Sequence, residues 1–338
     1  MFSIDTIPRI SLARLPTPLV PLTRFCNKHN IPKIWLKRDD LTDTTASGNK
    51  LRKLEFVIGQ ALEEGATTLI TCGGVQSNHC RATAVMASQL GLKCHLILRG
   101  KPTIPADGNL LLDELVGAKI TYATAQEFGD IDKMFEQVAD QYRQSGEVPY
   151  SIPVGASNEV GLWGYIEAAR ELKEDFSAAN ISPSHIVSAT GSGGTAGGLI
   201  LGRQLYDLDA QIMSFNVCDD EAYFQRKISA DFVIWQERYG IPIDFNNLAI
   251  NIVDGYVGPG YGRADKPVFD LIGDLARTEG VILDPVYTGK AFHGLMTELS
   301  TSRVTKSFKD GKDIVFIHTG GIFGLFPQKE HLVNTATV

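Results

Sequence analysis

The chain has 338 residues, and its 32 Lys plus Arg against 39 Asp plus Glu give a formal net charge of −7. This acidic balance argues against a protein whose main task is to bind nucleic acid or an anionic membrane. The length suits two domains of about 150 residues each. Five scattered cysteines without a C-x-x-C pair, and no run of 18 apolar residues, predict a cytoplasmic protein that does not span a membrane.

Short β-rich runs alternate with amphipathic stretches along almost the whole chain. The runs predicted as strands are 34–37, 68–72, 94–98, 119–123, 185–190, 211–217, 281–283 and 314–318. The stretches predicted as helices are 51–64, 78–90, 109–116, 131–144, 160–174, 196–206, 221–239, 267–278 and 289–302. Loops rich in Pro and Gly are predicted at 99–108, 149–155 and 256–262. Because strand and helix alternate, the fold class is α/β, with parallel sheets covered by helices.

A glycine-rich segment, GSGGTAGG at 191–198, connects the strand at 185–190 to an apolar helix. Free backbone N–H groups and a helix dipole at such a junction favour a bound phosphate. The same letters also fit a dinucleotide fingerprint, with Asp219 and Asp220 after the next strand, and a tight crossover without any ligand is a further interpretation. Several strand-helix units precede the segment, and the acidic pair lies beyond the spacing of about 20 residues, which weakens the dinucleotide alternative.

Two other predicted strand ends are also polar and rich in glycine. CGGVQSNH at 72–79 opens a helix at which Ser77 or Asn78 can serve as the N-cap, and HTGG at 318–321 puts a hydroxyl after the last strand. Ligands of α/β proteins gather at the carboxyl ends of strands. The three segments together therefore predict one polar site.

Lys50 lies in SGNKLRK, at a junction between a loop and the first long helix. Most lysines are solvated surface charges. In a chain with a separate phosphate loop, however, an amine for an aldehyde and an N–H cradle for a phosphate are the two anchors that pyridoxal phosphate needs. Lys50 is therefore the candidate for the covalent anchor.

The segments SGNKLRKLEF (47–56), CGGVQSNHCRATA (72–84), GPGYG (258–262), LDPVYTGKA (283–291) and HTGG (318–321) resemble the D-cysteine desulfhydrase and 1-aminocyclopropane-1-carboxylate deaminase family. These are pyridoxal-phosphate enzymes of fold type II, similar to the β subunit of tryptophan synthase. The resemblance runs in the right order from PTPL at 16–19 to HTGG.

The resemblance implies roles for the matching positions. Lys50 would form the Schiff base and, once freed, take the Cα proton. Asn78 would bond the ring hydroxyl of the cofactor and also face the substrate, while Ser77 and His79 would face the substrate, with Ser77 bonding its carboxylate. Tyr261 and Tyr287 match the active-site tyrosines and, with Thr288, would face the substrate. Thr319 would contact the cofactor. The phosphate would be held by Gly191, Ser192, Gly193, Gly194 and Thr195.

Three positions bear on the subgroup within this family. The deaminases carry Glu, an apolar residue and Gln where this chain has Thr288, Thr319 and His79. A hydroxyl near the pyridine nitrogen leaves the ring a weaker electron sink, which suits prompt β-elimination better than opening of a cyclopropane. The expectation is elimination from D-cysteine, giving sulfide, pyruvate and ammonia. Deamination of 1-aminocyclopropane-1-carboxylate and elimination from L-cysteine or another β-substituted amino acid stay open.

The family also implies two domains, with a smaller α/β domain at 54–161 inserted into a larger one made of 1–53 and 162–338. Copies of the chain are expected to pair as a homodimer, with a small amino acid as the substrate. A nicotinamide oxidoreductase and a non-catalytic sensor on the same fold are the alternatives from other functional classes.

Overall fold

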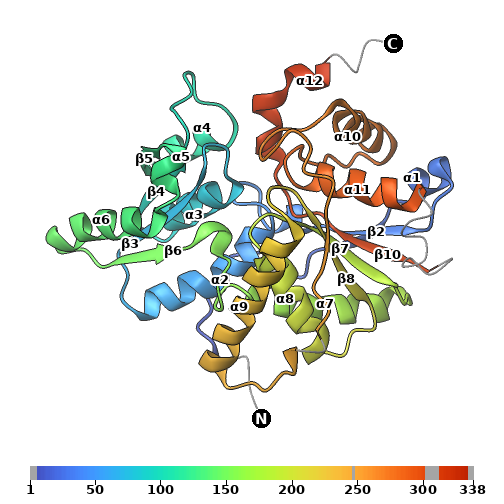
Figure 1. Ribbon diagram of the computed structural model, residues 1–338, viewed down its shortest axis with the longest axis horizontal. Coiled ribbons are helices and arrows are strands. Elements are labelled where there is room, and N and C mark those ends of the chain that lie inside the picture. The colour runs from blue at the N-terminus through green and yellow to red at the C-terminus, as the bar shows by residue number, and fades with distance from the viewer. Residues whose placement is uncertain (1–5, 246–247, 301–311, 334–338) are drawn as a thin grey trace.

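The computed structural model describes residues 6–245, 248–300 and 312–333. It contains two sheets flanked by helices, which lie side by side in Figure 1. The larger sheet has the strand order β1-β2-β10-β7-β8-β9. Its strands are β1 (Leu19–Pro21), β2 (Ile34–Lys37), β7 (His185–Thr190), β8 (Gln211–Asn216), β9 (Asn251–Val253) and β10 (Ile314–Ile317). All neighbours pair in parallel except β1, which runs antiparallel to β2 at the edge.

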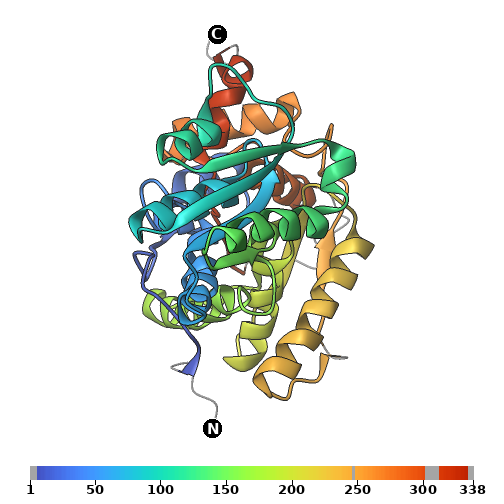
Figure 2. The same ribbon diagram turned by 90° about the vertical axis from the view of Figure 1, so that its left-hand side faces the viewer.

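The smaller sheet is parallel throughout and has the order β5-β4-β3-β6. Its strands are β3 (Thr68–Gly74), β4 (Lys93–Arg99), β5 (Lys119–Ala123) and β6 (Pro149–Ile152). They all come from one continuous stretch of chain, 68–152, which faces the viewer in Figure 2.

The helices connect the strands and cover both faces of each sheet. They are α1 (Thr23–His29), α2 (Asn49–Glu63), α3 (Asn78–Gln89), α4 (Gly108–Leu115), α5 (Ala125–Phe128), α6 (Ile131–Gln144), α7 (Trp163–Ala179), α8 (Gly194–Leu205), α9 (Glu221–Tyr239), α10 (Lys266–Glu279), α11 (Thr288–Ser300) and α12 (Glu330–Val333), with the short 3₁₀ helices η2 (Asp39–Leu41), η3 (Val154–Ala156) and η5 (Ile322–Gln328). None of the helices in the described ranges is both long and apolar enough to cross a membrane. The predicted α/β class is confirmed.

Four details of the predicted elements need correction. The run 281–283 is not a strand: Val281 and Leu283 are buried in the core, but this run pairs with no strand of either sheet. Residues 149–152, predicted as loop, form strand β6, in which Pro149 occupies the first position, where proline is tolerated. The antiparallel strand β1 was not expected, nor was β9. The end of the predicted helix 289–302, at 301–302, lies outside the described residues.

Two cores meet at the larger sheet. Along β7, Ile186 packs into the core of helices α7 and α8, whereas the next residue, Val187, packs into the core of α10 and α11. This alternation is what a strand that is buried on both faces requires. A third, smaller core lies between the smaller sheet and α6, with Ile70 and Val138 among its members.

Helix α7 lies directly against helix α2, which carries Lys50 near its start. A Cβ atom at Gly164 would lie 2.6 Å from the backbone of Arg52 and Lys53. We therefore expect Gly164→Ala to push the two helices apart and to lower the free energy of unfolding by about 1–3 kcal/mol. Denaturant unfolding measures this, with Ser177→Ala on the exposed side of α7 as the control, for which a change within about 0.5 kcal/mol is expected. Equal stability of the two variants would contradict the close contact.

Candidate active site

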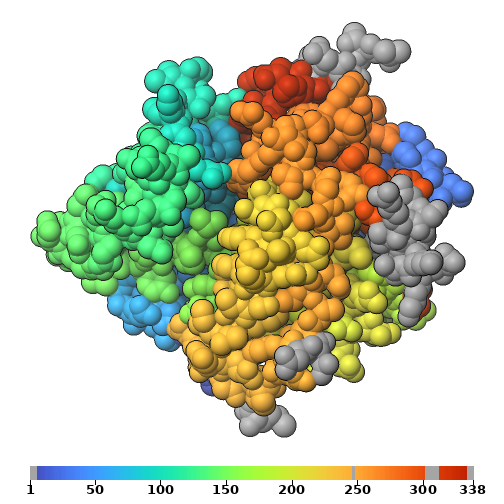
Figure 3. Space-filling view, in the orientation of Figure 1, coloured from blue at the N-terminus to red at the C-terminus, as the bar shows by residue number. Residues whose placement is uncertain are grey.

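A cavity of about 400 Å³ opens where the two sheets meet, at the carboxyl ends of their strands. In the space-filling view the green part of the chain meets the yellow and orange parts along this side of the molecule (Figure 3). Lining residues directly follow β7, β8 and β10, and others end β3 and β4. The volume suits a small ligand. The predicted site residues that line it are Lys50, Ser77, Asn78, His79, Gly191, Ser192, Gly193, Thr195, Tyr261, Tyr287 and Thr319.

Lys50 lies in the first turn of α2, and its Nζ donates a hydrogen bond of 2.9 Å to Asn49 Oδ1. Burial lowers the pKa of Lys50 to about 8; the negative charge of Asp284 opposes this shift, and the positive charge of Arg81 adds to it. A larger fraction of the amine is therefore neutral near physiological pH than in a surface lysine, as a nucleophile requires.

Asn49, which the sequence reasoning missed, connects Lys50 to the glycine-rich loop. Its Nδ2 donates to Thr195 Oγ1 at 2.9 Å, and its backbone N–H donates to the Thr319 carbonyl at 3.2 Å. The amine, the loop and the end of β10 are thus held together by one side chain and its backbone.

The loop between β7 and α8 leaves room only for glycine at several positions. A Cβ at Gly194 would lie 2.5 Å from Ser157 Oγ, one at Gly191 would lie 3.0 Å from the Tyr287 ring, and Gly193 has φ +84°. The twelve-residue helix α8 begins here, so its dipole and the N–H groups that follow Gly194 favour an anion. Gly194 itself does not line the cavity, and its N–H donates to Ser157 Oγ at 3.2 Å.

A second lysine, Lys53, supports this loop through Ser157. Lys53 is fully buried, and its Nζ donates to Ser157 Oγ at 3.1 Å and to the Gly155 carbonyl. Ser157 Oγ in turn lies 2.9 Å from Ser192 Oγ. Burial, with the charges of Lys50 and Lys227, lowers the pKa of Lys53 well below its usual value. Its spacing of three residues from Lys50 on one helix face was the signal available in the sequence.

Ser77 and His79 present defined polar groups at the start of α3. Ser77 is the N-cap and accepts the Cys80 N–H at 3.2 Å, so its own hydroxyl proton is available to a ligand. Thr71 Oγ1 donates its single proton to the Ile152 carbonyl, so His79 Nε2, at 2.7 Å, donates to Thr71. Burial, and the charges of the nearby lysines, lower the pKa of His79 well below its usual value, which keeps the ring neutral.

Tyr261 and Tyr287 form a hydroxyl pair with an O–O distance of 2.5 Å. Burial raises the pKa of Tyr261 to about 12 and that of Tyr287 well above its usual value, so both phenols are protonated. One proton lies between the two oxygens, and the other is available for donation into the cavity.

Thr288 does not line the cavity. Its Oγ1 donates to Asp284 Oδ1 at 2.6 Å, and the same carboxylate accepts the N–H groups of Val286, Tyr287 and Thr288 at 2.8 Å. Thr288 therefore contributes to holding Tyr287 in place through Asp284. This differs from the direct substrate contact that the resemblance implies, because the Thr288 hydroxyl binds the Asp284 carboxylate at the start of helix α11.

The outer part of the cavity contains further residues that were not predicted. Arg99 ends β4, and its guanidinium lies 5.4 Å from the ring centre of Phe128 and 5.7 Å from that of Tyr261. Cys218 and Asp219 follow β8, and Tyr223 lies in the first turn of α9. The sequence offered no pattern for Arg99, because strand-terminal arginines are common surface residues.

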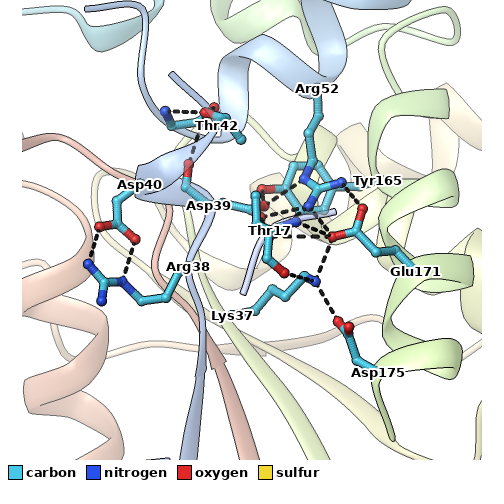
Figure 4. Close-up of polar contacts among 11 residues, drawn as sticks. Thr17, Lys37, Arg38, Asp39, Asp40, Thr42, Arg52, Tyr165, Glu171 and Asp175 are labelled. Atoms are coloured by element: carbon cyan, nitrogen blue, oxygen red, sulfur yellow. Dashed lines mark hydrogen bonds and ion pairs between the residues drawn. The ribbon is translucent and has the colours of Figure 1, made fainter. Parts of the chain in front are cut away.

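A buried network of charges lies beside the site and holds helix α2 (Figure 4). Arg52 donates to both oxygens of Asp39 at 2.8 and 3.0 Å, and to both oxygens of Glu171 at 2.9 Å. Tyr165 donates to Asp39 at 2.6 Å, and Lys37 pairs with Glu171 at 2.5 Å. Burial opposes ionisation of Glu171, but the hydrogen bonds and charge of Arg52, with the charge of Lys37, hold its pKa at about 2.

The side chains present fit pyridoxal phosphate. Lys50 can bind its aldehyde, and the N–H groups at the start of α8, where Cβ atoms would intrude, can bind its phosphate. The two anchors belong to one cavity and are joined through Asn49. The groups that would face the ring between them come from α3 and from the end of β10.

Comparison with known proteins agrees with this fit. The family model described as "Pyridoxal-phosphate dependent enzyme" matches residues 10–320. A protein of Thermotoga maritima, provisionally named 1-aminocyclopropane-1-carboxylate deaminase, is 41% identical over 326 residues, which cover 96% of this chain and 100% of that protein. The mitochondrial bifunctional D-cysteine desulfhydrase/1-aminocyclopropane-1-carboxylate deaminase of Arabidopsis thaliana is 40% identical over 341 residues, which cover 96% of this chain and 80% of the relative.

A solved structure described as that of an ACC deaminase homologue superposes with a TM-score of 0.88 at 34% identity, covering 98% of this chain and 97% of the other. The matched family places the chain among pyridoxal-phosphate enzymes and not among nicotinamide oxidoreductases, so the dinucleotide interpretation of the loop at 191–198 is not supported. The chain belongs to the pyridoxal-phosphate-dependent enzyme family, whose cofactor is pyridoxal phosphate.

Proposed function

We propose that this protein is a lyase that eliminates the β-substituent of a small amino acid, and that its substrate is D-cysteine, which is converted to sulfide, pyruvate and ammonia. The observation that carries the proposal is the hydroxyl of Thr319, which lines the cavity where β10 ends. Asp219 is the one described carboxylate among the lining residues, and it follows β8, two strands away from β10. A ring nitrogen facing Thr319 would meet no carboxylate, which favours prompt loss of a good leaving group such as a thiolate.

Pyridoxal phosphate, when bound, supplies an electron sink for the bond to the substrate Cα hydrogen. Lys50, whose pKa is about 8, is the group that accepts this proton. Ser77 donates its hydroxyl proton to the substrate carboxylate. His79, which is neutral and hydrogen-bonded to Thr71, lines the cavity beside Ser77.

The tyrosine pair is suited to the leaving group. A thiolate that departs from Cβ needs a proton to leave as hydrogen sulfide, and the Tyr261–Tyr287 pair holds one that is not shared between the two oxygens. Closure of the cavity would keep water away from the reacting carbons until the product leaves, after which its hydrolysis gives pyruvate and ammonia.

The assignment of residues 54–161 to a smaller domain that closes over this cavity is part of the proposal. Its support is that the guanidinium of Arg99, at the end of β4, lies 5.4 Å from the ring centre of Phe128 in α5 and 5.7 Å from that of Tyr261, and that all three residues line the cavity. We also propose a homodimer and a cytosolic location. The cytosolic location accords with the free state of all five cysteines, four of them buried.

The substrate is tested by mixing the purified holoenzyme separately with D-cysteine, L-cysteine and 1-aminocyclopropane-1-carboxylate, and assaying sulfide and 2-oxo acids. We expect sulfide and pyruvate chiefly from D-cysteine. A Thr319→Ala variant should retain at least part of this activity, because the proposal requires no charge at that position. Formation of 2-oxobutyrate from the cyclopropane as the main reaction would show that the Thr319 argument is wrong, and sulfide chiefly from L-cysteine would overturn the chirality alone.

A further inference from the structure

Arg81, on helix α3, is a buried guanidinium that makes no hydrogen bond to any carboxylate in the described parts of the chain. Its exposed fraction is 0%. Nη2 donates to the Ser47 carbonyl at 2.7 Å, Nη1 donates to Asn109 Oδ1 at 3.1 Å, and the guanidinium lies 4.7 Å from the centre of the Phe323 ring. Burial lowers its pKa to about 10, so the group stays charged at neutral pH. A buried charge without an ion pair is costly to maintain, and its two hydrogen bonds both lead to the active site.

The hydrogen bond from Arg81 to Asn109 decides the orientation of two amides. Arginine can only donate, so the atom of Asn109 that it contacts must be the oxygen. The NH₂ group of Asn109 then donates to Asn78 Oδ1 and to the Gln76 carbonyl, each at 3.1 Å. Asn78 consequently keeps its own NH₂ group for the cavity that it lines, because no described residue accepts from it. If the Asn109 amide were rotated by half a turn, its oxygen would face Asn78, and the Asn78 amide would have to turn its NH₂ group away from the cavity.

The hydrogen bond from Arg81 to the Ser47 carbonyl holds the loop before Lys50. Ser47 is followed by Gly48, where a Cβ atom would lie 2.6 Å from the Thr319 carbonyl, and then by Asn49 and Lys50. The loop is therefore held between α3 on one side and the end of β10 on the other. Movement of the Ser47 carbonyl would carry the first turn of α2 with it.

We propose that Arg81 and Asn109 are positioning residues for the cofactor: Arg81 fixes both the loop that carries Lys50 and the amide of Asn109, and Asn109 turns the NH₂ group of Asn78 toward the cofactor ring. Neither residue lines the cavity. They act on the cofactor only through Asn78 and Lys50. We call this chain of hydrogen bonds through Arg81, Asn109 and Asn78 the relay. It concerns cofactor binding and not the choice of substrate, so the relay can be disproved while D-cysteine elimination is confirmed, and D-cysteine elimination can be disproved while the relay is confirmed.

Several charged groups determine the ionisation of Lys50, and Arg81 is one of them. Its positive charge favours the neutral amine, whereas Asp284 favours the charged one. Lys53 and His79 also interact electrostatically with Lys50, and Lys50 Nζ lies 5.8 Å from the centre of the Tyr287 ring. The relay thus adds an electrostatic contribution to its geometric one.

The variant Asn109→Asp separates the relay from general packing. The new carboxylate accepts from Arg81 as before, and the backbone N–H still donates to Gln76 Oε1, at 2.8 Å in the parent, but the donor to Asn78 is lost. We expect the dissociation constant for pyridoxal phosphate, measured by titrating the apoenzyme, to increase about fivefold to tenfold. The visible absorbance band of the bound cofactor should shift, and the thermal unfolding midpoint should change by no more than a few degrees.

Asp113→Asn is the matched control. Asp113 lies on the same helix α4, is equally buried and interacts electrostatically with Arg81, but has no hydrogen bond to the relay. Its substitution should leave the cofactor affinity within twofold and the absorbance band unchanged. Arg81→Lys, which keeps the charge but cannot span both acceptors, should reproduce the effect of Asn109→Asp. A wild-type affinity and absorbance band in both relay variants, or an equal change in Asp113→Asn, would overturn the proposal.

Discussion

Turnover is expected to fall by about 10²–10⁴-fold or more in Lys50→Ala, because the variant loses both the covalent anchor and the base for the Cα proton. Borohydride should no longer fix pyridoxal phosphate to the protein. Mass spectrometry of the reduced protein measures the attachment directly, and sulfide release from D-cysteine measures the rate. The attachment does not depend on the substrate, so the cofactor assignment is tested separately from the reaction.

Lys53→Ala is the comparison for this result, since Lys53 lies one turn further along α2 and is also buried. It contacts Ser157 and the Gly155 carbonyl, which support the phosphate loop. We expect borohydride still to fix the cofactor at Lys50, with an affinity for pyridoxal phosphate about tenfold lower. If borohydride still attached the cofactor to Lys50→Ala but not to Lys53→Ala, Lys53 and not Lys50 would be the covalent anchor.

The variant Arg52→Ala is expected to lower the free energy of unfolding by about 3–5 kcal/mol, because Asp39 and Glu171 would stay buried without their cation. Denaturant unfolding at neutral pH provides the measurement. Arg38→Ala, which breaks the partly exposed pair between Arg38 and Asp40 in Figure 4, should cost less than about 1 kcal/mol. If the two variants are equally stable, the network does not hold helix α2.

The same network gives a signed dependence on pH. The pKa of Glu171 is about 2 in the folded protein and about 4.5 in the unfolded chain, so folding favours the ionised form. Its contribution is complete above pH 4.5 and is lost as the pH falls toward 2. The stability of the parent should therefore decrease over this interval, and the decrease should be smaller in Arg52→Ala. An identical slope in the two proteins would mean that Arg52 does not lower the pKa.

The sequence was most informative where periodicity and burial act together. Helices α6 and α9 begin and end at the predicted residues, since each alternates between a core face and a solvent face. The run 281–283 misled because its apolar residues are buried without a strand partner, and hydrophobicity alone does not reveal hydrogen bonding. Strand β1 is short and lies at an edge, where few of its side chains are buried.

The site was predictable where a motif joins a strand to a helix. Lys50, Ser77, Asn78 and the loop at 191–195 lie in such motifs, and the structure brings them to one cavity apart from Gly194. Arg81 and Asn109 carry no signal, because their importance depends on an amide contact between residues 31 positions apart. Lys53 and Ser157 meet across 104 positions of sequence. Such long-range polar contacts have no period that a single sequence could display.

The position of β10 has a consequence for biosynthesis. This strand lies between β2 and β7, so residues 314–317 complete the middle of the larger sheet, although they are synthesised almost 280 residues after β2. The smaller sheet uses only residues 68–152 and can form on the ribosome long before. In a nascent chain, β2 and β7 would thus lack their common neighbour, and the cofactor pocket would stay incomplete, until Thr319 has emerged.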